Sequence, residues 1–226
     1  MRISILCPTR GRPESCAEML RTIKQSVSNP HNVRVLLYVD DDDPCVDRYV
    51  PLHDPGNVEV VIGAPVGVGH AWNELAKLTD ADLLWMGNDD LRYEQHGFDR
   101  ILINAVGDMK YACLWGDDGI NGENHCAFPA ITRQWHKQLG YFTPVCFRFF
   151  YHDTWIFDVA KRIGRAVYVP DLKISHRHHT VDGGVRDATT LRNRTDGQAE
   201  EDKATWDRTE YARAESAKLL MEMMGR

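Results

Sequence analysis

The chain has 226 residues, of which 43% are hydrophobic and 27% charged, and its formal charge is -6. This composition is that of an ordinary globular protein with room for one full core, and the acidic balance gives no global basis for nucleic-acid binding, although it leaves a local basic face open. No apolar run reaches the length of a membrane span, no signal peptide precedes the first apolar run, and the six cysteines form no C-x-x-C pair. We therefore expect a cytoplasmic protein with free thiols.

The first 90 residues alternate between short apolar runs and segments with helical spacing of apolar residues. The predicted strands are residues 3–7, 33–39, 58–62 and 83–86, and the predicted helices are residues 14–28 and 70–78. An apolar run bounded by glycine, proline or polar residues is typical of a strand buried on both faces. Strands that alternate with helices predict a parallel, doubly wound α/β sheet.

The second half is less regular. We predict helices at 98–106, 130–139 and 153–163, strands at 111–115, 166–169 and 172–175, and an amphipathic helix at 200–224. The domain division that follows is residues 1–180 for the sheet domain, 181–199 for a basic flexible segment and 200–226 for the C-terminal helix. We expect this last helix to pack on the domain or against a second copy, as in a homodimer.

The run Leu-Leu-Trp-Met-Gly-Asn-Asp-Asp ends in Asn88, Asp89 and Asp90. Ligands bind beyond the carboxyl ends of strands in such sheets. Adjacent carboxylates suit Mg²⁺ or Mn²⁺, which are often shared with substrate phosphates. For an isolated pair of this kind, a helix N-cap is the favoured explanation.

Polar clusters also follow the first and second predicted strands. Pro8, Thr9, Arg10 and Arg12 follow the first, and a run of aspartates that begins at Asp40 follows the second. Capping explains one such cluster, but it explains three at one sheet edge poorly. The pattern therefore predicts a site for a cation and a diphosphate, with the two arginines either contacting phosphate or lying in a solvated turn.

Together these features resemble the GT-A fold glycosyltransferases, in particular the family 2 type, over residues 1–180. Residues 7–10 (Cys-Pro-Thr-Arg) look like the strand end that contacts the nucleotide, and residues 39–41 look like the acid that recognises the base. Residues 67–73 are similar to the glycine-led helix start, and 87–90 resemble the D-x-D metal motif. The resemblance implies a single GT-A (Rossmann-like) domain whose mostly parallel sheet is flanked by helices. The implied nucleotide-contact residues are Pro8, Thr9, Arg10, Arg12, Asp40, Asn73, Asn88 and Asp89.

The resemblance also implies a bound Mn²⁺ or Mg²⁺ and a UDP- or GDP-sugar donor. Asn88 replaces the first acid of the D-x-D motif, which leaves Asp90 as the expected metal ligand with Asp89 as its helper. The cation would act as a Lewis acid on the departing diphosphate.

Residues 176–179 contain three histidines, which raises the question of a zinc site. There are no matching cysteine pairs, and alternate residues on a strand face opposite ways, so one ion would take two of them at most. In related glycosyltransferases a histidine after the last strand completes the metal shell or touches the diphosphate, and His176 or His178 looks like that residue. We favour His176 because it directly follows the strand, and a purely structural histidine stays open.

Residues 151–155 resemble the acidic motif in which this fold places its general base, with His152 where the family often has Glu. Asp153 is the candidate base for an acceptor hydroxyl, and transfer would then invert the configuration of the sugar. A role as the N-cap of the following helix is compatible with this one.

Residues 161–194 contain eight lysine and arginine residues against three aspartates. Such a segment can hold an anionic acceptor, such as an acidic glycan, a phosphorylated lipid or modified DNA, or close over the donor diphosphate. We favour closure over the donor.

Two other functions use a similar sheet. A nucleotidyltransferase usually has a glycine-rich basic loop after its first strand, whereas residues 8–13 here contain two prolines and one glycine. The second alternative function is that of a nucleotide-binding module without catalysis, in which Asn88 would mark a lost metal site. Gly63, Gly67 and Gly69 do not form the G-x-G-x-x-G of a dinucleotide site.

Overall fold

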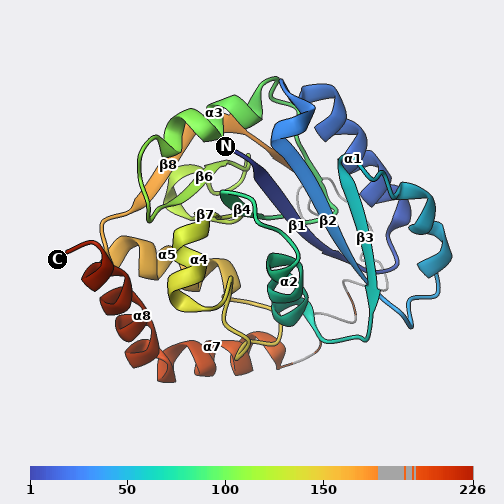
Figure 1. Cartoon of the computed structure of the whole chain (residues 1–226). Coiled ribbons are helices and arrows are strands. Elements are labelled where there is room, and N and C mark those ends of the chain that lie inside the picture. Colours follow the sequence, from blue (N-terminus) through green and yellow to red (C-terminus); the bar gives the residue numbers. More distant parts are fainter. Residues whose placement is uncertain (178–190, 192–194, 196, 226) are drawn as a thin grey trace.

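The computed structural model describes residues 1–177, 191, 195 and 197–225, and a seven-stranded sheet lies at its centre (Figure 1). The strands of this sheet are β1 (Ile3–Thr9), β2 (Val33–Asp40), β3 (Val58–Gly63), β4 (Leu83–Met86), β6 (Cys113–Asp117), β7 (Ala130–Thr132) and β8 (Ala166–Lys173). Their order is β3-β2-β1-β4-β7-β6-β8. β7 runs antiparallel to both of its neighbours and the other pairs are parallel, so the predicted α/β class with a mostly parallel sheet is confirmed.

Helices cover both faces of the sheet. The α-helices are α1 (Pro13–Ser26), α2 (Val68–Lys77), α3 (Phe98–Val106), α4 (Arg133–Leu139), α5 (His152–Arg162), α7 (Gln198–Arg208) and α8 (Glu210–Met223). Short 3-10 turns occupy Pro30–Asn32, Val46–Arg48, Val50–Leu52 and Gly122–Asn124. A separate two-stranded ribbon joins β5 (Leu91–Arg92) to β9 (Ser175–His176).

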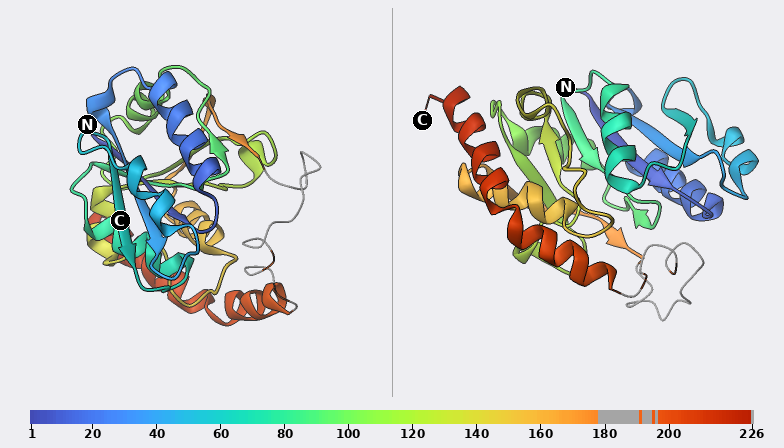
Figure 2. Two further views of the ribbon diagram at one scale, coloured as in Figure 1. Left: turned by 90° about the vertical axis from the view of Figure 1, so that its right-hand side faces the viewer. Right: turned by 90° about the horizontal axis from the view of Figure 1, so that it is seen from below.

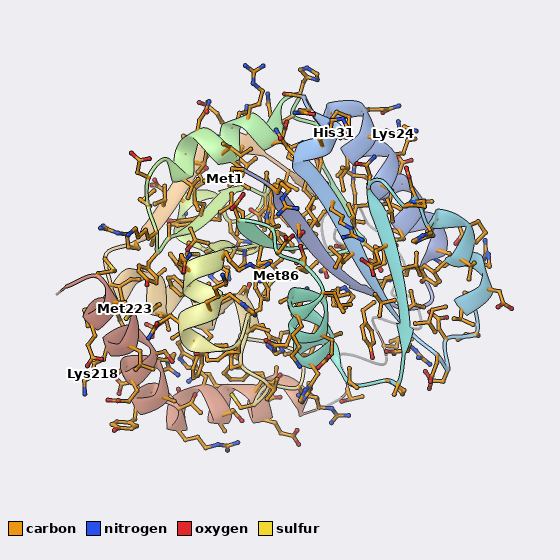
Figure 3. The ribbon with its side chains drawn as sticks, in the orientation of Figure 1. Met1, Lys24, His31, Met86, Lys218 and Met223 are labelled. Atoms are coloured by element: carbon orange, nitrogen blue, oxygen red, sulfur yellow. The ribbon has the colours of Figure 1, made fainter. Side chains whose placement is uncertain are left out.

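Alternate residues of the central strands enter two different cores. On β1, Ile5 packs with α1 and α3, whereas Leu6 packs with α2, α4 and α5. Because both faces are covered, both sets of positions favour apolar side chains, which explains the nearly continuous apolar runs. The buried Ser4 of β1 is hydrogen-bonded to the Thr79 hydroxyl at 2.8 Å. Met86, the last residue of β4, lies in the middle of the view in Figure 3, while Lys24 and Lys218 lie at opposite sides of the molecule.

Two predicted elements differ from the structure for reasons of tertiary pairing. The predicted helix 130–139 is a strand, β7, followed by α4, because Ala130 and Ile131 fill the gap between β4 and β6. The two short strands predicted at 166–175 are largely one strand, β8, with Pro170 inside it. β8 is the edge of the sheet, where the missing N–H of proline breaks no interior ladder.

The predicted single C-terminal helix is two helices, α7 and α8, which meet at Thr209. Ala217 and Leu220 of α8 are buried against the core formed with α4 and α5, so this helix packs on the domain, one of the two arrangements expected (Figure 2). Most of the predicted flexible segment 181–199, together with His178 and His179, lies outside the described residues. Among the residues that the structure describes, no helix has the length and apolarity to cross a membrane. The cysteines are free thiols, as predicted.

Candidate functional site

A cavity of about 260 Å³ opens at the carboxyl ends of β1, β2 and β4. The structure brings together seven of the eight residues predicted to contact a nucleotide, because these strand ends meet at one edge of the sheet. The cavity is lined by Pro8, Thr9, Arg10, Arg12, Tyr38, Asp40, Gly67, Val68, Ala71, Asn88, Asp89, Arg148 and Phe149.

Asn73, the eighth predicted residue, does not line this cavity. Its side chain is buried inside α2, where Nδ2 donates to the carbonyls of Gly69 and Thr143, each at 2.7 Å, and Oδ1 accepts from the amide of Phe142 at 2.7 Å. These contacts join α2 to the segment before α5, so the geometry gives Asn73 a structural role.

Both predicted phosphate-binding arginines already face carboxylates. Nη1 of Arg10 lies 2.9 Å from Oδ2 of Asp40 and also contacts Asp42, and Nη1 of Arg12 lies 3.2 Å from Oδ1 of Asp89. Their charges are therefore largely balanced within the protein, and they add little net positive potential to the cavity.

Asp89 is held on both of its oxygens. Oδ2 accepts from the Thr9 hydroxyl at 2.7 Å, while Arg12 contacts Oδ1. Burial and the neighbouring charge of Asp90 raise the pKa of Asp89 to about 6, against the opposing effect of Arg12. Asp89 is thus better placed to fix the strand end than to help bind a metal.

Asp90 and His176, the two predicted metal ligands, lie side by side. The β5–β9 ribbon pairs Leu91 with His176, which places Nε2 of His176 3.5 Å from Oδ2 of Asp90. Burial opposes ionisation of Asp90, but the hydrogen bond and charge of His176 outweigh it and lower the pKa of Asp90.

The other oxygen of Asp90 suits a cation. Oδ1 is buried and has no hydrogen-bond partner within the described part of the chain. A buried carboxylate oxygen without a donor is costly unless a cation joins it, and a carboxylate is the type of ligand that suits Mn²⁺ or Mg²⁺. Within the described residues no group of three or more acidic, histidine or cysteine side chains gathers around one point. The described residues thus place one carboxylate beside one imidazole here, which is fewer ligands than a complete metal shell.

The N-terminus of α2 borders the same cavity. Gly67 precedes the helix with φ of 81°, a conformation that favours glycine, and no side chain caps the first turn. The unsatisfied amides and the positive end of the helix dipole favour an anion at this position.

Asp153 lies in the first turn of α5, outside the residues that line the cavity. Its Oδ1 accepts from the amide of Thr154 at 2.7 Å, and its Oδ2 lies 3.0 Å from Nε2 of His125. The bond to Asp153 raises the pKa of His125. His152, by contrast, is buried between aromatic rings.

Sequence reasoning missed His125 and Arg148. His125 follows a loop of glycine and polar residues without periodicity, and Arg148 lies in a segment between α4 and α5 that contains neither helix nor strand. No spacing in the sequence connects these residues with the strand ends.

Solved structures with a similar fold include a mannosyltransferase and TarS. The mannosyltransferase PcManGT from Pyrobaculum calidifontis, in complex with GDP-Man and Mn²⁺, superposes with a TM-score of 0.61 at 16% identity, covering 77% of this chain and 56% of that one. S. aureus TarS 1-349 in complex with UDP gives a TM-score of 0.61 at 12% identity over 77% of this chain and 59% of TarS 1-349. The complex of TarS 1-349 with UDP-GlcNAc gives 0.58 at 13% identity over 85% and 64%.

This chain therefore has a GT-A-like glycosyltransferase fold, as the sequence predicted. It spans only part of the length of these structures, 56% of PcManGT and 59% of TarS 1-349 with UDP. A comparison with protein-family profiles found no match, and neither did a comparison with curated proteins.

Proposed function

We propose that this protein is a metal-dependent, inverting glycosyltransferase that moves a sugar from a UDP- or GDP-sugar to an acceptor hydroxyl. The observation that carries the proposal is the meeting of the β1, β2 and β4 ends in one cavity. Asp90 and His176 are paired next to Asp89, although neither is among the residues that line this cavity. The likeness to structures that bind GDP-Man with Mn²⁺ and UDP-GlcNAc supports a nucleotide-sugar donor.

Asp90 and His176 are the residues that would hold the cation. When bound, it would act as a Lewis acid on the diphosphate leaving group. The protein contributes a buried carboxylate whose charge is maintained by the neighbouring imidazole, and the α2 N-terminus contributes amides aimed at phosphate oxygens. Asp40 and Tyr38 line the side of the cavity proposed for the base and ribose.

Asp153 is the proposed general base. A carboxylate in the first turn of α5 can accept the proton of an acceptor hydroxyl as that oxygen attacks the anomeric carbon. Its contacts with Thr154 and His125 use some of the carboxylate lone pairs, and its side chain keeps 27% of its surface exposed to an acceptor.

The first test is ligand binding by calorimetry with UDP, GDP and their sugars, with and without Mn²⁺. Binding that tightens with Mn²⁺ in the native protein and loses this dependence in Asp90→Ala supports the proposal. Asp108→Asn, which changes an exposed aspartate after α3, is the matched control and should behave like the native protein.

The second test separates binding from chemistry. Asp153→Asn should bind the donor sugar as the native protein does and lose about 100- to 10,000-fold in its turnover, measured as release of the nucleoside diphosphate. Retained turnover in Asp153→Asn would mean that another group is the base. Metal-independent binding without turnover in the native protein would instead favour the inert nucleotide-binding module, and a preference for triphosphates would favour a nucleotidyltransferase.

A further inference from the structure

The cavity has a third arginine whose charge is not balanced. Arg148 lines the cavity with an exposed side chain, and its guanidinium contacts no carboxylate in the described parts of the chain, residues 1–177 and 197–225. Arg10 and Arg12 in the same cavity face Asp40 and Asp89. Among the described lining residues, Arg148 is thus the cation that adds net positive charge for an incoming anion.

The backbone around Arg148 is fixed by a residue far along the chain. Asp202 of α7 is 2% exposed, and its carboxylate accepts hydrogen bonds from three consecutive backbone amides. These are the amides of Arg148 at 2.9 Å, Phe149 at 2.9 Å and Phe150 at 2.8 Å. This segment belongs to no helix or strand, so its amides need such a partner. Burial alone would raise the pKa of Asp202, but these amides outweigh it and lower the pKa.

Two further contacts of the C-terminal helices hold the same segment. The ring of Trp206, one turn after Asp202, stacks on Tyr151 with centroids 5.5 Å apart and an angle of 24°. Tyr151 has φ of 70°, a strained value for a residue other than glycine, which persists only where its surroundings fix it. The buried Arg213 of α8 lies 3.6 Å above the Trp206 ring and donates to its carbonyl. Figure 1 shows α7 below α2 and α4, with the segment between α4 and α5 in between.

We propose that Arg148 binds the diphosphate of the nucleotide donor and that Asp202 is the positioning residue that holds it there. The inference rests on the proposed function, because it names the ligand group within the same cavity. The guanidinium of Arg148 and the open N-terminus of α2 line one cavity, and two of the diphosphate oxygens can accept from the planar fork of an arginine. The helices α7 and α8 are on this view part of the donor site.

Asp202 does not touch the ligand. Its buried carboxylate contacts the backbone amides of the 148–150 segment and the side chain of Gln198 on its own helix. Its effect must therefore pass through Arg148 and Phe149, which makes a specific prediction about coupling between the two variants.

The experiment compares the affinities of UDP, GDP, UMP and GMP by calorimetry in the presence of Mn²⁺. Arg148→Ala should weaken diphosphate binding about 10- to 100-fold and monophosphate binding much less, since one charge-assisted fork is lost. Arg148→Lys should restore part of the loss. Arg100→Ala, which removes an exposed charge from α3, is the matched control and should match the native protein.

Asp202→Asn should lower the ratio of diphosphate to monophosphate affinity by a smaller factor, and the double variant should be no weaker than Arg148→Ala alone. Equal diphosphate affinities of Arg148→Ala and Arg100→Ala would overturn the inference, while strictly additive losses would overturn the positioning role of Asp202. Because the Arg148 side chain is exposed, its variants test the inference even if Asp202→Asn does not fold. If the native protein binds none of the nucleotides, the proposed function fails first and this inference fails with it.

Discussion

His152 provides a quantitative prediction about acid sensitivity. The imidazole is 2% exposed, lies edge-on to Trp72 with centroids 5.5 Å apart, and has its Nδ1 3.1 Å from the Thr143 hydroxyl. Its Nε2 has no hydrogen-bond partner among the described residues. Burial lowers the pKa of His152 to about 4, so the folded protein keeps this ring neutral well below the pH at which an exposed histidine is protonated.

The sign and size of the effect follow from the two states. The unfolded chain takes up a proton at His152 near its ordinary pKa of about 6.5, while the folded chain does so only near pH 4. The stabilising contribution is therefore complete above pH 6.5 and is lost as the pH falls. The loss amounts to about 2 kcal/mol at pH 5 and about 3 kcal/mol at pH 4.

Urea unfolding at a series of pH values measures this loss. His152→Gln has no titrating group at this position. Between pH 7 and pH 5 or 4, its free energy of unfolding should therefore fall by less than that of the native protein, and the difference should equal the losses given above, whatever its stability at pH 7. His31→Gln, which changes an exposed histidine, should follow the native pH dependence. Parallel curves for the native protein and His152→Gln would show that the ring is not held neutral in the fold.

Other predictions concern single contacts. Gly69→Ala would place a Cβ 2.5 Å from Cε1 of His152, so thermal unfolding should show a loss of about 1–3 kcal/mol, and an unchanged midpoint would contradict the tight approach of α2 to α5. Asp153→Asn should lower the pKa of His125, observed in an NMR titration of the imidazole, because the ring loses its carboxylate partner; equal values in both proteins would mean that the pair does not form in solution. Cys146 is the exposed thiol, and Cys146→Ser should remove the fast phase of labelling by a thiol reagent in the native state. A fast phase that persists in this variant would contradict the prediction and would have to come from the half-buried Cys45 or a buried cysteine.

The strand ends were predictable because the chemistry there follows local rules. Leu83–Met86 is bounded by glycine and polar residues, and the structure gives the strand the same limits as the sequence. Parallel strands bring their carboxyl ends to one edge, so the meeting of Thr9, Asp40 and Asp89 in one cavity required only the predicted topology.

The remaining features depend on contacts between distant segments. The β-strand conformation of Ala130 and Ile131 comes from pairing with two neighbours, and nothing in their local pattern distinguishes it from a helix start. The roles of Arg10 and Arg12 likewise depend on which carboxylates the fold places opposite them. The proximity of Arg148 to the cavity has no local signal, since its backbone is held by a residue 54 positions away.

That separation has a consequence for the order in which the protein becomes functional. A ribosome delivers β1, β2 and β4 early, and their contacts can form as soon as these segments emerge. The wall made by residues 148–150 must wait for α7, because its amides have their carboxylate partner only there. On the proposed function, a nascent chain would hence acquire the β1, β2 and β4 ends before the wall at residues 148–150, and nucleotide added during refolding should bind only in the last kinetic phase.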